Sequence, residues 1–353
     1  MAEGVLGLIV TGGETSPLQG LGISPARALT PFAAQYRLLD FALATTANSG
    51  VRQVSLVSIP DTGAARFPRV LAACQRAALT FEPEWLVVLG GDHILQVDVR
   101  PVLEALTASE ADISLLALSL RADDRYAHPT VVTDDGRELS WGGDFVVRAA
   151  AVPRLLRAFE RPDAGNGHTT TTLCATVPVV VYDVAQPTAD GPRLYWHEPA
   201  SLETYYASQM DLCTPEPALD LYDPSWPIRS VTSGLPPAKV TSDAGCGHMG
   251  QAVNSLLADG CVIRGGAVIR SVVGPSCLVD AGAEIEDSIL LDGCRIGPGA
   301  HIRRAVVGPG VVVAAGEDVG YDEPLRAHAL RLPSGLTLLP APGTSPALAV
   351  SAH

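Results

Sequence analysis

The chain has 353 residues, of which 47% are hydrophobic and 18% charged, and its formal net charge is −14 at pH 7. This length exceeds the ~250–300 residues at which single cores stop growing, so two domains are expected. The acidic balance, without clustered Lys and Arg, disfavours nucleic acid and anionic membranes as partners. Apolar runs fall short of the ~18 residues that span a bilayer, and residues 1–10 show no signal-peptide pattern. We therefore expect a cytoplasmic protein.

The seven cysteines form no CxxC pair and no Cys/His cluster. Their spacing argues against both a zinc site and a disulfide framework. We expect free thiols, most of them buried.

Strand and helix patterns alternate through the first part of the chain. The predicted strands are 5–10, 51–59, 85–89 and 112–120, and the predicted helices are 36–48, 67–79 and 99–109. This alternation predicts an α/β domain, Rossmann-like, with a mostly parallel sheet covered on both faces. Ligands of such sheets bind beyond the carboxyl ends of the strands, where Gly12-Gly13 and Gly91-Asp92 lie.

The last third of the chain is periodic. Three sets of residues recur every 17 positions, namely Val262, Val279, Ile296 and Val313; Val268, Ile285, Ile302 and Val319; and Gly265, Gly282, Gly299 and Gly316. Members of the first and second sets lie six residues apart, which is the hexapeptide step of a left-handed parallel β-helix. The glycines suit corners that need a positive φ.

These patterns divide the chain into four parts. Residues 1–212 are expected to form the α/β domain, and the proline-rich residues 213–240 a linking strap. Residues 241–325 are expected to form the β-helix. Residues 326–353 should supply a closing strand at 335–339 and a mobile tail.

Several segments carry a family resemblance. Residues 31–52 read PFAAQYRLLDFALATTANSGVR and resemble the motif PFGGKYRLIDFAL…NSGIR. Gly91-Asp92-His93-Ile94 resembles GDHI, and residues 195–212 and 221–239 resemble YWRDVGTLDAYWEANMDL and LYDRDWPIRT…LPPAKF. In these motifs and their order, the chain resembles the bacterial ADP-glucose pyrophosphorylases, also called glucose-1-phosphate adenylyltransferases. The resemblance implies a GT-A-like nucleotidyltransferase domain.

The resemblance also implies a reaction and a phosphate loop. The family joins ATP and glucose 1-phosphate to give ADP-glucose and pyrophosphate, with Mg²⁺, for glycogen or starch synthesis. Its loop reads GGxG(S/T)RLxPLT, which assigns nucleotide contacts here to Gly12, Gly13 and Ser16. The loop's Arg is replaced by Pro17, which removes a cation and an N–H donor. Losing one such donor typically costs ~3–4 kcal/mol of transition-state stabilisation.

Other site residues follow from the same resemblance. Arg27 stands where the family's RAKP segment has a Lys, so it is a candidate catalytic cation. Asp92 is the candidate catalytic and first metal carboxylate, and with Gly91 it contacts the nucleotide. Glu198 corresponds to the second metal carboxylate. Alternatively, Asp92 is only a polar residue that caps a strand end.

Three family features have no counterpart. The EKP motif, whose Lys holds the sugar phosphate, is missing from residues 135–145, and DFGKD is missing from residues 165–172. Some tens of residues that include adenine-side contacts are missing between Ser58 and Asp61. These losses indicate a shortened family member with degraded active-site motifs.

Three functions are compatible with these observations. The first is a non-catalytic regulatory or partner subunit, in a homo-oligomer or a hetero-oligomer with a catalytic ADP-glucose pyrophosphorylase, that retains ATP, ADP-glucose or a sugar phosphate as ligand. The second is an active nucleotidyltransferase that uses Asp92, Glu198, Arg27 and Arg37. Mg²⁺ is expected only if activity or nucleotide binding is retained. The third, a hexapeptide acyltransferase, needs a histidine base between coils, and His301 is expected to point outward.

Overall fold

The computed structural model describes residues 4–12, 16–23, 26–60, 66–118, 130–132, 138–159, 169–184, 195–231, 234–243, 245, 247–321 and 329–344. The chain divides into two compact units. Unit 1 comprises residues 1–14, 39–196 and 223–228, and unit 2 comprises residues 15–38, 197–222 and 229–353. Unit 2 therefore includes one segment, residues 15–38, from the first half of the chain. The domain boundaries expected at 212 and 240 stay predictions.

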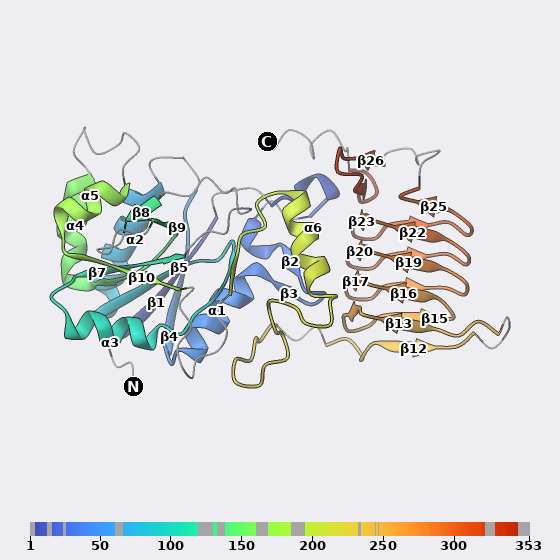
Figure 1. Cartoon of the computed structure of the whole chain (residues 1–353), viewed down its shortest axis with the longest axis horizontal. Helices are drawn as coiled ribbons and strands as arrows, with labels where there is room; N and C mark the ends of the chain where they lie inside the picture. Colours follow the sequence, from blue (N-terminus) through green and yellow to red (C-terminus); the bar gives the residue numbers. More distant parts are fainter. Residues whose placement is uncertain are drawn as a thin grey trace. The chain divides into compact units, whose positions relative to one another are not determined.

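Unit 1 is built on a seven-stranded sheet in the order β10-β7-β9-β5-β1-β4, with β8 paired to β9 (Figure 1). Its strands are β1 (Val5–Thr11), β4 (Gln53–Ser58), β5 (Trp85–Gly90), β7 (Ile113–Leu118), β8 (Thr130–Val132), β9 (Glu138–Arg148) and β10 (Val179–Asp183). The pairs β1–β4, β1–β5 and β7–β10 are parallel, whereas β9 runs antiparallel to β5, β7 and β8. The α/β fold class is confirmed, with β9 as an addition.

Helices cover both faces of this sheet. They are α1 (Leu38–Asn48), α2 (Arg66–Phe81), α3 (Arg100–Ala108), α4 (Val152–Phe159) and α5 (Thr169–Thr176). On one face of the sheet, β1 shares a hydrophobic core with α2, α4 and α5, which includes Leu6 and Leu71. On the other face, Gly7 lies under Thr46 of α1, where a Cβ would come within 3.2 Å of the Thr methyl group. A short pair, β6 (Ile94–Gln96) with β11 (Tyr195–His197), follows β5.

Unit 2 is built around a parallel β-helix of three sheets (Figure 1). The first sheet contains β12 (Lys239–Thr241), β15 (Val262–Arg264), β18 (Leu278–Val279), β21 (Arg295–Ile296) and β24 (Val312–Val313). The second contains β13 (Gln251–Val253), β16 (Ala267–Ile269), β19 (Glu284–Glu286), β22 (His301–Arg303) and β25 (Asp318–Val319). The third contains β14 (Leu256–Leu257), β17 (Val272–Val273), β20 (Ile289–Leu290), β23 (Ala305–Val307), β27 (Thr337–Leu339) and β26 (Leu330–Arg331). The segment expected as a closing strand forms β27, which pairs in parallel with β23.

The stacked residues of the core correct one position of the predicted repeat. Val268, Ile285, Ile302 and Val319 pair in register and are all buried, as expected. In the first set, however, Val279 stacks on Ile263, and Val262 pairs instead with Leu278. Ile263 is fully buried, so the prediction of Val262 as a core residue was wrong. The cause is the length of the coil. β15 pairs with β18 at an offset of 16 residues, whereas the pairs β16–β19 and β18–β21 have an offset of 17.

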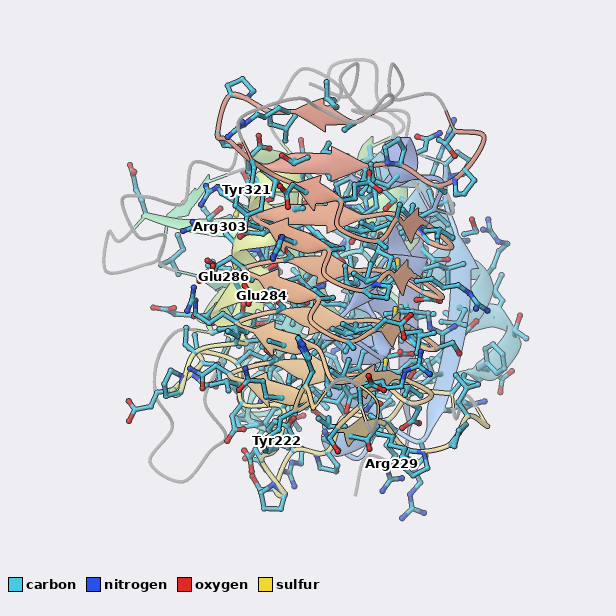
Figure 2. The ribbon with its side chains drawn as sticks, turned by 90° about the vertical axis from the view of Figure 1, so that its right-hand side faces the viewer. Tyr222, Arg229, Glu284, Glu286, Arg303 and Tyr321 are labelled. Carbon is cyan, nitrogen blue, oxygen red and sulfur yellow. The ribbon has the colours of Figure 1, made fainter. Side chains whose placement is uncertain are left out.

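The second sheet exposes a charged outer surface. Figure 2 shows Glu284, Glu286, Arg303 and Tyr321 on this side of the β-helix. His301 pairs between Glu284 and Asp318, and its Nδ1 lies 2.9 Å from Asp318 Oδ1. The His301 side chain is 42% exposed, as expected for a residue that points outward. Its position favours a surface hydrogen bond with Asp318 over acyl-transfer chemistry.

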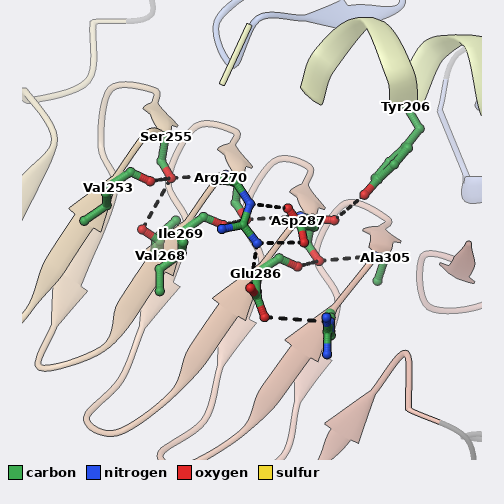
Figure 3. Close-up of polar contacts among 12 residues, drawn as sticks. Tyr206, Val253, Ser255, Val268, Ile269, Arg270, Glu286, Asp287 and Ala305 are labelled. Carbon is green, nitrogen blue, oxygen red and sulfur yellow. Dashed lines mark hydrogen bonds and ion pairs between the residues drawn. The ribbon is translucent and has the colours of Figure 1, made fainter. Parts of the chain in front are cut away.

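Helix α6 (Leu202–Asp211) packs at one corner of the β-helix. Ser201 caps the start of this helix, and its Oγ accepts a hydrogen bond from the Thr204 N–H, 3.1 Å away. Tyr206 Oη donates to the Asp287 carbonyl at 2.7 Å (Figure 3). The Asp287 side chain also forms an ion pair with Arg270. This corner therefore joins coils to each other and to α6.

The hairpin before α1 is held by the same helix. Strands β2 (Pro31–Phe32) and β3 (Tyr36–Arg37) are joined by residues 33–35, of which Ala33 and Ala34 have positive φ values, 50° and 67°. Gln209 of α6 accepts a hydrogen bond from the Ala33 N–H at 3.0 Å. Tyr205 donates to the Pro31 carbonyl at 2.9 Å. These contacts hold a turn in which non-glycine residues are strained.

No helix in the described part of the chain is long and apolar enough to cross a membrane.

Candidate functional site

The carboxyl ends of β1 and β5 form the edge at which the sheet topology predicts ligand binding. Because β4 and β5 lie on opposite sides of β1, the strand order reverses there, and such points bind ligands in open α/β sheets. Gly12 follows β1 with φ +83°, and a Cβ there would lie 2.7 Å from Ser58 Oγ. The Gly91 N–H donates to the Val10 carbonyl at 2.9 Å. Gly12 and Gly91 thus share this edge, while Gly13 lies outside the described residues.

Asp92, the candidate metal carboxylate of unit 1, lies in a buried polar cluster. Its Oδ2 is 2.8 Å from Nη2 of Arg66, the first residue of α2. Its Oδ1 is 3.1 Å from Nδ1 of His93. His93 Nε2 in turn lies 2.7 Å from Oδ2 of Asp144, in the middle of β9. Cations therefore contact both oxygens of Asp92.

The geometry of this cluster fixes the charge of His93. Carboxylates only accept hydrogen bonds, so a ring with carboxylate oxygens at both nitrogens must carry both protons. Burial favours the neutral ring, but the charges and hydrogen bonds of Asp144 and Asp92 outweigh it and raise the pKa of His93 to about 10. With Arg66, the four side chains balance two positive against two negative charges.

Hydrogen bonds from Gly90 and Trp141 hold Asp144 in place. Its Oδ1 accepts a hydrogen bond from the Gly90 N–H at 2.8 Å, and its carbonyl accepts one from Trp141 Nε1 at 2.7 Å. Asp144 is 1% exposed. The cluster is thus tied to β5 and β9, two neighbouring strands in the middle of the sheet.

In unit 2, Arg27 and Glu198 form an ion pair of their own. Arg27 opens the short 3-10 helix Arg27–Leu29, and its Nη2 lies 3.0 Å from Glu198 Oε1. The Arg27 side chain is only 2% exposed and that of Glu198 14%. Nearby in sequence, Ser16 is buried and its Oγ bonds to Thr30 Oγ1 at 2.8 Å and accepts the Leu18 N–H at 3.2 Å. These polar groups are engaged within the unit.

The residues as placed do not fit a magnesium ion. Mg²⁺ needs oxygen ligands at ~2.0–2.1 Å in near-octahedral order. Both oxygens of Asp92 face nitrogen cations, and Glu198 faces Arg27. Within the described ranges, no group of three His, Cys, Asp or Glu side chains could hold a metal ion.

The site residues predicted from the sequence fall into two groups. Gly12, Gly91 and Asp92 share one edge of the unit 1 sheet, and Arg27 pairs with Glu198 in unit 2. Sequence reasoning missed Arg66 and Asp144. Arg66 lies outside the segments that resemble the family, and Asp144 follows the Gly142-Gly143 pair without belonging to a recognisable motif.

Comparisons with known proteins agree with this architecture. The family described as "GlmU-like, C-terminal hexapeptide" matches residues 236–339. The glucose-1-phosphate adenylyltransferase of Frankia casuarinae is 29% identical over 385 residues, covering 90% of this chain and 92% of the relative. This chain is a homologue of the glucose-1-phosphate adenylyltransferases. Those of Leifsonia xyli and Deinococcus radiodurans are 27% and 26% identical, covering 90% and 91% of this chain and 92% and 94% of their own lengths.

Proposed function

We propose that this chain is a non-catalytic homologue of glucose-1-phosphate adenylyltransferase and acts as a regulatory or partner subunit beside a catalytic enzyme of that family. Its setting would be glycogen biosynthesis in the cytoplasm, without contact with nucleic acid or membranes. Any ATP, ADP-glucose or sugar phosphate that it binds would act as an effector, not as a substrate.

The observation that carries this proposal is the buried ion pair between Arg27 and Glu198. An arginine that stabilises a transferring phosphoryl group must offer its charge to that group. Arg27 is almost fully buried, and its charge is offset by Glu198 at 3.0 Å. Since Pro17 replaces the loop arginine of the resembled motif, two cationic positions of the phosphate site no longer supply an available charge.

The β-helix supports the partner-subunit part of the proposal. Among the described residues, β12, β13 and β14 each have a strand partner on one side only, so the first coil presents open edges. The same coil exposes Val240, Met249 and Val253. Open strand edges with exposed apolar side chains favour pairing with another chain. We propose that a family subunit, identical or catalytic, covers this end.

Pyrophosphate release from ATP and glucose 1-phosphate with Mg²⁺ tests the proposal. The purified chain should be inactive alone and should change the rate or effector response of the ADP-glucose pyrophosphorylase from the same organism when the two are mixed. The alternative is an active nucleotidyltransferase, which the retained carboxylates Asp92 and Glu198 favour. Turnover by the chain alone that disappears in Asp92→Asn would establish this alternative and refute the proposal.

A further inference from the structure

The contact between Arg66 and Asp92 joins two elements at the ligand-binding edge of unit 1. Arg66 begins α2, whereas Asp92 follows β5, and Nη2 and Oδ2 lie 2.8 Å apart. The Asp92 side chain is 9% exposed and that of Arg66 32%. An arginine at this distance forms a charge-assisted hydrogen bond, and its guanidinium stays charged at every physiological pH.

The second oxygen of Asp92 is also engaged. His93 Nδ1 lies 3.1 Å from Oδ1, and the His93 ring is anchored at its other nitrogen by Asp144. A divalent ion at Asp92 would need an oxygen with its lone pairs directed at the metal. It would therefore have to displace Arg66, because His93 is fixed by the buried β9 carboxylate.

We infer that Arg66 is a built-in counter-ion that takes the place of a divalent metal at Asp92, so that this centre works without Mg²⁺. The chain keeps the Asp92 carboxylate but neutralises its charge with the guanidinium of Arg66. A phosphorylated ligand at this edge would then meet a fixed guanidinium instead of an exchangeable ion. The inference rests on the proposed function, because a catalytic nucleotidyltransferase of this family needs the metal.

Manganese binding tests this inference directly. The full chain is titrated with Mn²⁺ alone, and the electron paramagnetic resonance signal of the free ion reports uptake. We expect no saturable uptake by the wild type at submillimolar Mn²⁺. Arg66→Gln should expose Asp92 and take up about one ion, at least tenfold more tightly than the wild type, and Arg66→Gln with Asp92→Asn should lose it.

Arg76→Gln is the matched control, because Arg76 is an exposed arginine on the same helix. This variant should behave as the wild type, and circular dichroism should show that all variants are folded. Uptake of one ion by the wild type that disappears in Asp92→Asn would overturn the inference. So would the absence of uptake by folded Arg66→Gln, because Arg66 would then not be what excludes the metal.

The metal-uptake experiment and the turnover experiment test the two proposals separately. If the chain is inactive but binds Mn²⁺ at Asp92, the role of Arg66 as a counter-ion is refuted and the proposed function is not. A chain that turns over ATP without Mn²⁺ uptake at Asp92 would refute the proposed function alone.

Discussion

His93 Nε2 lies 2.7 Å from Oδ2 of Asp144, and this contact ties the loop after β5 to the centre of β9. The two residues are 51 positions apart in the chain. Because Asp92 holds the other ring nitrogen, His93 is a buried cation between two carboxylates. Its ionisation should therefore affect the stability of unit 1.

Stability should fall as the pH rises above neutrality. The pKa of His93 is raised from 6.5 to about 10, so the folded state binds a proton that the unfolded state releases. This contribution is fully present below pH 6.5 and is lost as the pH rises through about 10. Urea unfolding across this range should show a loss of roughly a few kcal/mol, which His93→Gln should flatten. A slope in His93→Gln equal to that of the wild type would refute the assignment.

Arg27 should matter for folding. Arg27→Met removes the cation beside the mostly buried Glu198 carboxylate, so we expect a loss of about 3–5 kcal/mol in the free energy of unfolding. Adding Glu198→Leu should recover part of this loss, which a double-mutant cycle measures. The exposed pair Arg100–Asp98 is the control, and Arg100→Met should cost less than ~1 kcal/mol. A similar small effect at Arg27 would contradict the buried pair.

The corrected register of the β-helix predicts unequal effects at neighbouring positions. Ile263 is fully buried in the stack with Val279, whereas Val262 is only partly buried. Ile263→Ala should cost about 2–5 kcal/mol. Val262→Ala removes a side chain outside the core and should cost clearly less. Calorimetry of both variants measures the two losses of stability. A larger loss for Val262→Ala than for Ile263→Ala would support the uniform 17-residue repeat instead.

Replacing alanine by glycine in the turn after β2 should stabilise the chain. Ala34 has φ 67°, where a Cβ is unfavourable by roughly 1–2 kcal/mol, and the resembled family motif has glycine there. The greater freedom of glycine in the unfolded chain offsets up to ~1 kcal/mol, so a small rise in the melting temperature is expected for Ala34→Gly. Ala72→Gly, inside α2, should lower it. A lower melting temperature for Ala34→Gly would show that the turn is not strained.

One thiol should be accessible to thiol reagents in the native state. Of the six cysteines in the described part of the chain, Cys174 is exposed and the others are buried. Burial raises the pKa of Cys213 to about 11 and that of Cys74 to about 12, which suppresses their thiolates. In a Cys246→Ser background, Ellman's reagent at mildly alkaline pH should label one thiol, and Cys174→Ser should abolish that reaction. Rapid labelling of Cys74 would contradict its burial.

Periodic features were predicted well from the sequence. The stack from Val268 to Val319 and the strands β1 and β5 follow from local patterns, because core residues recur at the spacing of the structure that they form. The pairing of Ile263 with Val279 was not predicted. The interval from Ile263 to Gly265 is one residue shorter than the corresponding interval from Val279 to Gly282, and the apolar Val262 keeps the apparent 17-residue spacing.

The candidate site was predicted only where a motif marks it. Asp92 and Gly91 lie in a recognisable segment, but their partners come from elsewhere. Arg66 begins α2, and Asp144 lies in β9, a strand that the sequence patterns did not predict. Contacts between residues so far apart depend on which strands become neighbours in the sheet, and periodicity within a segment carries no information about that order.

The short step between Ile263 and Gly265 also shows where the β-helix accepts changes of length. In the preceding coil, the same corner holds a loop in which the Asp243 N–H donates to the His248 carbonyl at 2.8 Å, and the Gly265 N–H donates to the Thr241 carbonyl at 2.8 Å. One coil is thus lengthened and the next shortened at a single corner, while the strands on either side keep their register. This corner is where a peptide tag or a small reporter domain could be inserted into the chain without interrupting the core of the β-helix.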